Sequence, residues 1–282
     1  MPKHSHFLHV LLLSTALVSS ACTGETPQPA GSSSSASSSS GSGGMGGDGG
    51  AAGNGGAGGS GGVAGSGGGG GAGGSGGSAM VPLPGFGTIT GACGVVDAMQ
   101  IESPDPVVFR DTIDFAMDVY DREKLSPGGK IIYDIGNLGG SSLESEIMSY
   151  EVLYRCELAD LLKTESEIMY TDPMGKKTDL LVSIDMFKVG VSVTRAYAFP
   201  PEDPYTEQQA YDLLSKKLLD IQSSTTNVAP EDAWPKQILH VLAYTQAHAD
   251  AMEAAYATLD ASVRADTILW LTVTEGNDEF IY

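Results

Sequence analysis

Hydrophobic and polar positions in the second half of the chain alternate between helical and strand-like spacing. Ser141 and Glu144 match a capping box, and the apolar residues that follow recur at helical spacing. They predict a helix over about 142–157. Period-two alternation then predicts three strands separated by turns, at 161–170, 178–186 and 189–199. Because the links between these strands are short, we expect an antiparallel meander.

The remaining C-terminal pattern predicts more helices and strands. Thr206 and Gln209 form a second capping box, and the helix that they open has an inner face made of Ala210, Leu213, Leu214, Lys217, Leu218 and Ile221. Later segments predict a helix over 246–259, a strand over 267–274 and a short pairing segment at 280–282. The run 238–244 fits either a strand or a short helix.

Fewer regular patterns precede residue 141. The Pro- and Gly-rich stretch 80–106 is expected to be loop, 107–120 fits either a strand or a helix, and 131–133 is a short strand-like run. Together the patterns predict one α/β (α+β) domain at 80–282, with its core at about 107–282. Its mixed sheet should contain the three-stranded antiparallel meander, flanked by helices.

The N-terminal part has a different composition. Residues 31–78 contain 25 of the 38 glycines, and most of their other positions are Ser or Ala. Such a segment has almost no apolar surface to offset the entropy of ordering. We therefore expect residues 22–79 to be a disordered Gly/Ser-rich tether ahead of the domain.

The first residues resemble a secretion signal. Lys3 precedes an apolar run, Phe7 to Val18, which is too short to span a membrane. Small residues then lead to Cys22, and this arrangement resembles the lipobox of bacterial lipoproteins. The resemblance implies that residues 1–21 are a signal peptide and that lipid on Cys22 attaches the protein to a membrane of the cell envelope, on its periplasmic face or at the cell surface. An ordinary cleaved signal peptide with an incidental cysteine is the alternative.

Two further cysteines, Cys93 and Cys156, lie within the domain. In an oxidising compartment an even pair is a candidate disulfide. Two free buried thiols are the alternative.

Most enzyme signatures are missing from the sequence. Residues 80–282 have no GxSxG, HExxH or CxxC motif, and no GxGxxG follows a predicted strand. His240 and His248 are expected to be structural or surface residues, so no cofactor is predicted.

Residues 80–282 carry 14 basic and 33 acidic side chains, a net charge of −19. Repulsion from phosphates makes nucleic acid an unfavourable partner.

One constellation suggests chemistry. The order helix, three-stranded meander, helix, strand over about 141–275 resembles the core of the PD-(D/E)XK nuclease-like superfamily. In that family an acid on the helix, an Asp on the second strand and an E-x-K on the third hold a divalent metal. The resemblance assigns the helix acid to Glu146, with Glu144 and Glu151 as competitors, and the Asp to Asp179. Ser192 and Thr194 stand where the family has Glu and Lys.

Two functions follow as hypotheses. The first is an envelope lipoprotein that presents a tethered, non-catalytic binding or interaction domain to an unknown protein or small molecule. The alternative is a metal-dependent phosphodiesterase or nuclease, with Glu146 and Asp179 as metal ligands and with Glu146, Asp179, Ser192 and Thr194 as the candidate catalytic positions. Loss of one carboxylate leaves too few ligands for a good magnesium site, and loss of the lysine removes a group that helps to activate water; both losses favour the first hypothesis.

Overall fold

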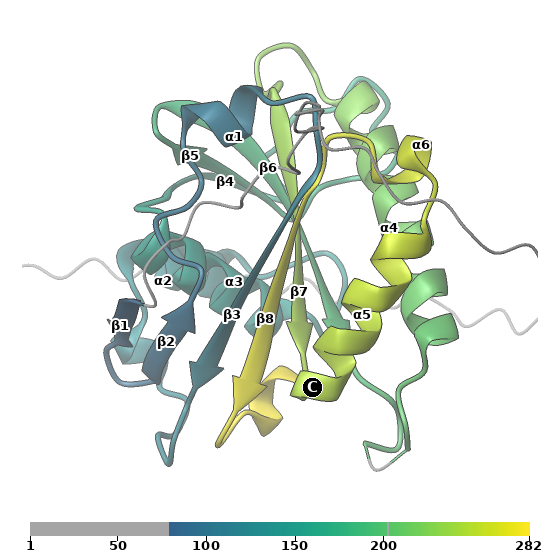
Figure 1. Ribbon diagram of the computed structural model, residues 1–282. Helices are drawn as coiled ribbons and strands as arrows, with labels where there is room; N and C mark the ends of the chain where they lie inside the picture. The colour runs from purple at the N-terminus through teal and green to yellow at the C-terminus, as the bar shows by residue number, and fades with distance from the viewer. Residues whose placement is uncertain (1–78, 202) are drawn as a thin grey trace, which may run out of the picture. The chain divides into compact units, whose positions relative to one another are not determined.

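A mixed sheet of eight strands organises the folded part of the chain (Figure 1). The computed structural model describes residues 79–201 and 203–282; Cys22 and the Gly/Ser-rich segment lie outside the described residues. The strands are β1 (Ala79–Leu83), β2 (Gly87–Gly91), β3 (Val107–Asp114), β4 (Asp160–Thr164), β5 (Leu180–Ile184), β6 (Phe187–Ala196), β7 (Lys236–Ala243) and β8 (Ile268–Glu275). Their order across the sheet is β1-β2-β3-β8-β7-β6-β5-β4.

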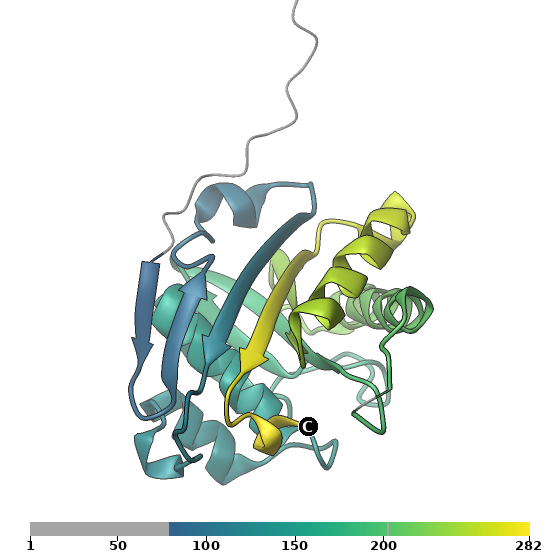
Figure 2. The ribbon, with the colours of Figure 1, turned by 60° about the horizontal axis from the view of Figure 1, so that its bottom comes forward.

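Strand directions divide the sheet into three parts. β4, β5 and β6 form an antiparallel meander, with Leu180 paired to Val191 across β5 and β6. β6, β7, β8 and β3 run parallel to one another, and Figure 2 shows β3 and β8 side by side with the C-terminus just beyond β8. β2 then pairs antiparallel with β3, and β1 pairs antiparallel with β2 at the edge of the sheet. The mixed sheet with its meander confirms the predicted fold class.

Helices cover both faces of this sheet (Figure 1). α3 packs on one face, and α4 and α5 pack on the other. None of the helices in the described part of the chain has the length and apolar character that a membrane span requires. The α-helices are α1 (Ala98–Glu102), α2 (Pro127–Ile135), α3 (Leu143–Cys156), α4 (Glu207–Asn227), α5 (Gln246–Thr258) and α6 (Ala261–Arg264), and the 3₁₀ helices are η1 (Arg122–Lys124) and η2 (Glu279–Ile281).

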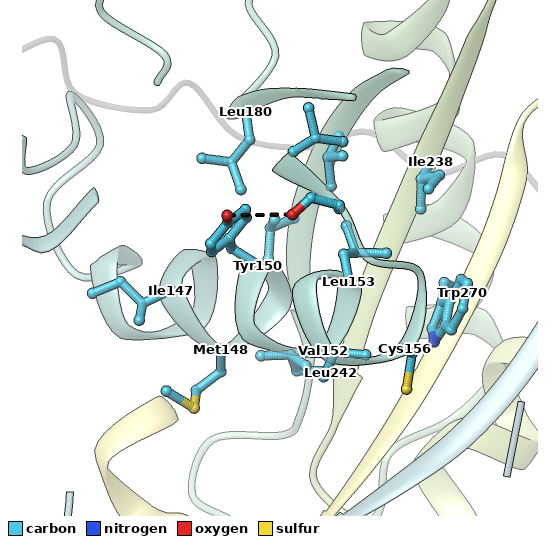
Figure 3. Packing of buried hydrophobic residues seen from close by; sticks show 14 of the residues in the cluster. Ile147, Met148, Tyr150, Val152, Leu153, Cys156, Leu180, Ile238, Leu242 and Trp270 are labelled. Atoms are coloured by element: carbon cyan, nitrogen blue, oxygen red, sulfur yellow. Dashed lines mark hydrogen bonds between the residues drawn. The ribbon is translucent and has the colours of Figure 1, made fainter. Parts of the chain in front are cut away.

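The largest apolar cluster surrounds α3 (Figure 3). Ile147, Met148, Val152 and Leu153 of this helix have no exposed surface, and they lie among strand residues that include Ile238 and Trp270. Tyr150 is also buried, and its hydroxyl accepts a hydrogen bond from the Leu161 amide at 3.2 Å. Helix α3 is therefore fixed both to the sheet and to the first strand of the meander.

The segment before Val107 differs from the prediction. It was expected to be loop, but it contains β1, β2 and α1, and the buried core extends into it through Leu83, Phe86 and Ile89. β2 forms by pairing with β3, and β1 forms by pairing with β2, which a local pattern rich in Pro and Gly does not reveal. The ambiguous run 107–120 contains β3, and 238–244 largely coincides with β7.

Helix α2 corrects a second expectation. The strand-like run 131–133 is helical, because the Ser126 side chain accepts a hydrogen bond from the Gly129 amide at 3.0 Å and Pro127 suits the first turn.

Ser142, and not Ser141, precedes α3, and no side-chain cap forms there. The predicted Thr206–Gln209 capping box is present at the start of α4. Residues 280–282 do not pair with β8, and η2 covers most of them.

Cys93 and Cys156 form a disulfide, with their Cα atoms 4.5 Å apart. This bond joins the link between β2 and α1 to the last residue of α3. The pairing is the one expected from the sequence, and it closes across 63 positions of the chain.

Both edges of the sheet are short and irregular. β1 has five residues, one of which is Pro82, and proline lacks an amide hydrogen. β4 also has five residues, and its pairing with β5 shifts register between Leu161 and Lys163.

Gly190 in β6 is required by the packing of Trp234. A Cβ atom at this position would lie 2.8 Å from Trp234 Cε2. We expect Gly190→Ala to lower the free energy of unfolding by about 1–3 kcal/mol, because the indole is buried and has to shift. Gly139→Ala is the control, since its Cβ would lie no closer than 3.5 Å to Ser142 Oγ. Urea denaturation of both variants measures the effect, and equal stabilities would contradict this account of Gly190.

Candidate functional site

Asp179 lies where β5 begins, beside the second half of β6. Its amide donates a hydrogen bond to the Val191 carbonyl at 3.1 Å, and its carboxylate Oδ2 accepts one from the Val193 amide at 2.6 Å. The antiparallel register therefore fixes the carboxylate against the backbone of β6. The residue as a whole is partly exposed, whereas its carboxylate lies against the strand.

Glu146 approaches the same region from the first turn of α3. Its Oε1 accepts hydrogen bonds from Asn137 Nδ2 at 2.9 Å and from Ser142 Oγ at 2.8 Å. The side chain is buried and lies close enough to Asp179 for the two charges to interact. Of its two competitors, Glu151 is committed elsewhere, since its carboxylate accepts a hydrogen bond from the Ser126 amide at 2.7 Å.

A third carboxylate, Glu165, lies in the turn after β4. Its Oε2 accepts a hydrogen bond from the Leu138 amide at 3.1 Å, beside the Asn137 that contacts Glu146. Its negative charge acts on both Asp179 and Glu146. Glu165 falls within the predicted strand 161–170, but that strand ends at Thr164 and Glu165 belongs to the turn that follows it.

Burial dominates the electrostatics of this group. It raises the pKa of Glu146 to about 7, and the charge of Asp179 contributes in the same direction. Burial also raises the pKa of Asp179 to about 6, although the positive charge of Lys217 opposes the shift. Titratable groups shifted in this way gather at functional sites more often than elsewhere.

Lys217 was not among the candidate site residues. It lies on α4, and its Nζ donates a hydrogen bond to the Val193 carbonyl at 3.2 Å. The ammonium group is thus held beside the strand segment that also binds Asp179. The sequence indicated its position only through its place among the apolar inner-face residues of the helix that follows Thr206.

Ser192 and Thr194 lie on β6 but differ in their surroundings. Ser192 is buried, and its Oγ is 3.4 Å from Gln237 Nε2. The same amide donates to Thr178 Oγ1 at 2.7 Å, so Ser192 belongs to an internal polar network. Thr194 is partly exposed. The hydroxyl of Ser192 therefore has a structural role at the position where the nuclease-like family has a carboxylate.

These residues do not fit a divalent metal as they are arranged. Within residues 79–282, leaving out 202, no three His, Cys, Asp or Glu side chains are grouped closely enough to hold a metal ion. Glu146 uses one oxygen for Asn137 and Ser142, and Asp179 uses one for β6. Hard cations need several oxygen ligands in a fixed geometry.

The two histidines of the domain lie elsewhere. His240 is fully buried, and its ring nitrogens are hydrogen-bonded to Ser149 Oγ and Thr272 Oγ1, each at 2.7 Å. Burial lowers its pKa to about 3, so it stays neutral. Ser149, His240 and Thr272 thus form a buried polar chain between α3 and the sheet, which a substrate cannot reach. His248 is also buried and stacks on Tyr205.

Comparison with known proteins finds a relative that shares part of the chain. The chain is 38% identical over 164 residues to the AAC-rich mRNA clone AAC4 protein of Dictyostelium discoideum, a match that covers 56% of this chain and 24% of that protein. The chain thus spans about a quarter of the length of this relative, whose name specifies no activity. No protein-family model matches the chain. No solved structure matches it.

The raised pKa of Glu146 predicts a specific pH dependence. The native state binds its proton more tightly than the unfolded state does, so the free energy of unfolding should fall as pH rises from about 4.5 to about 7. We expect Glu146→Gln to remove this part of the slope and to stabilise the domain by about 1–3 kcal/mol at pH 8. The amide oxygen can still accept from Asn137 and Ser142.

Denaturation with urea at pH 4, 6 and 8 provides the measurement. Glu144→Gln, on the same turn of α3 but partly exposed, is the matched control and should keep the wild-type slope. A Glu146→Gln protein whose stability varies with pH as the wild type does would show that Glu146 titrates normally.

Proposed function

We propose that this protein is a cell-envelope lipoprotein, attached through Cys22, whose folded domain is a non-catalytic binding or interaction module. The supports for attachment are the short apolar run before Cys22 and the Gly/Ser-rich segment after it. A disulfide within the domain is in keeping with an oxidising compartment. The module would work through the site at β5 and β6.

The observation that carries the binding role is the mixed charge of that site. Asp179 and Glu165 are partly exposed, and Lys217 is partly exposed beside them. The site thus offers fixed acceptors and one fixed donor to a ligand, with an excess of negative charge that favours a cationic group. Metal-assisted hydrolysis needs a cation held by several oxygens and a group that activates water. The hydroxyls of Ser192 and Thr194 supply neither.

A metal-dependent phosphodiesterase is the second candidate. One observation favours it: Glu146, Glu165 and Asp179 come from three separate elements and interact through their charges. Lys217 adds a cationic group near β6, whereas Thr194 stands at the position of the lysine in the nuclease-like family. Against it stand the domain charge of −19 and the absence of a ready metal group in the described residues.

Attachment by lipid makes a direct prediction for Cys22. The wild-type protein, expressed in a bacterium that lipidates its own envelope proteins, should enter the detergent phase on phase separation. Cys22→Ala should remain in the aqueous phase because it has no thiol to modify. Thr23→Ala is the neighbouring control and should behave as the wild type. Recovery of wild type and Cys22→Ala in the same phase would exclude a lipid anchor.

Activity assays separate the two candidate functions. We expect no saturable heat on titration with Mg²⁺ or Mn²⁺, and no cleavage of plasmid or single-stranded DNA in their presence. Asp179→Asn and Lys217→Met test the site, and Asp185→Asn, in the exposed turn between β5 and β6, is the matched control. Metal-dependent cleavage that disappears in Asp179→Asn and Lys217→Met, but persists in Asp185→Asn, would replace the binding role by the phosphodiesterase.

A further inference from the structure

The carboxylate of Glu157 lies at an unusual place, immediately after the C-terminal end of α3. Carbonyl groups give this end of a helix a partial negative charge, so an acidic residue is unfavourable there. Glu157 is also buried, and burial raises the pKa of its side chain. The helix itself therefore gains nothing from a carboxylate at this position.

Three consecutive backbone amides compensate for that cost. Gly94 N donates to Oε1 at 2.8 Å, Val96 N donates to Oε2 at 2.9 Å, and Val95 N lies within 3.2 Å of both oxygens. Such a run of amides forms a concave anion site, here filled by the protein's own side chain. Hydrogen bonds to a charged group are among the strong ones in proteins. We refer to Glu157 and the amides of residues 94–96 as the carboxylate clamp.

The clamp lies directly beside the disulfide. Cys93 precedes the first amide donor, and Cys156 precedes the acceptor. All three donors are backbone groups, so neither sulfur atom takes part in the hydrogen bonds of the clamp. A clamp that formed in the reduced chain would hold the two thiols next to each other.

Chain statistics alone do not select this pair. The protein has three cysteines, and Cys22 lies 71 positions before Cys93, while Cys156 lies 63 positions after it. Loop-closure entropy grows only with the logarithm of loop length, so loops of 63 and 71 residues are almost equally probable in an unfolded chain. A structural cause is needed to favour one pair strongly over the other.

We propose that Glu157 directs the oxidation of Cys93 to Cys156 and thereby keeps Cys22 out of disulfides. Glu157 is a positioning residue, and it takes no part in the bond changes. A thiolate of one cysteine attacks an oxidising disulfide such as glutathione disulfide and releases one glutathione. The second cysteine then attacks the mixed disulfide and releases the other glutathione, so two thiols are oxidised and one external disulfide is reduced.

The choice of cysteine pair also matters for the proposed lipid attachment at Cys22. A Cys22 captured by Cys93 or Cys156 has no free thiol for lipid, so the clamp protects the attachment site under the function proposed above. The selection itself rests only on the clamp geometry, and its test requires neither lipid nor membrane.

The test follows disulfide formation in the reduced full chain. The chain, with its N-terminal segment uncleaved and without lipid, is exposed to glutathione disulfide, quenched with acid, and mapped by peptide mass. We expect the wild type to form the Cys93–Cys156 bond as its main product. In Glu157→Gln this bond should form about tenfold more slowly, the effect of losing one charge-assisted hydrogen bond, and products containing Cys22 should rise. Glu102→Gln, at the exposed end of α1, is the matched control.

Two further measurements separate positioning from other effects of Glu157. The first measures the reactivity of a single domain thiol, in Cys93→Ser and in Cys156→Ser, each with and without Glu157→Gln. If Glu157→Gln leaves this reactivity unchanged, its effect on disulfide formation comes from geometry and not from the thiolate population. In the Cys93→Ser/Cys156→Ser protein, the amides of Gly94, Val95 and Val96 should exchange slowly with solvent, and Glu157→Gln should abolish that protection. Unprotected amides with Glu157 intact, or equal disulfide products in wild type and Glu157→Gln, would overturn the proposal.

Discussion

The burial of α3 against the sheet is the interaction on which the other features of the domain depend. Its apolar side chains fill the larger core cluster, and several of its polar side chains reach a different neighbour. Glu146 at its start faces the candidate site, Ser149 in its middle contacts His240, and Glu151 caps the segment that begins α2. Cys156 at its end carries the disulfide. A shift of α3 would therefore disturb the site, the internal polar chain and the clamp together.

Charge gives the domain a second constraint. An excess of 19 negative charges has to be accommodated, and the few basic side chains are placed where they offset particular carboxylates. Lys163 pairs with the buried Asp232 at 2.7 Å, and Lys217 offsets Asp179. Glu146 and Asp111 have no such partner, and burial raises the pKa of each to about 7. Neutral pH thus lies within the range where these buried acids change protonation.

The strongly periodic parts of the sequence were predicted well. The meander, α4 with its capping box and α5 all follow from local spacing, because their apolar positions match the face that packs on the sheet. β1 and β2 were missed because β2 is stabilised by pairing with β3 and β1 by pairing with β2, and neither strand shows an alternation of its own. Glu146 and Asp179 were found through a family resemblance. Glu165 and Lys217 were not, because only the folded sheet brings a turn after β4 and the inner face of α4 to the same strand end.

The irregular edge strands bear on how copies of this domain meet one another. An open sheet exposes unpaired amide and carbonyl groups at its outer strands, and these can recruit a strand from a neighbouring molecule. Here Pro82 interrupts one edge, and a register shift beside Lys163 interrupts the other. Neither edge presents a long regular ladder. A neighbouring molecule therefore finds little regular backbone at either edge to which it could add a strand.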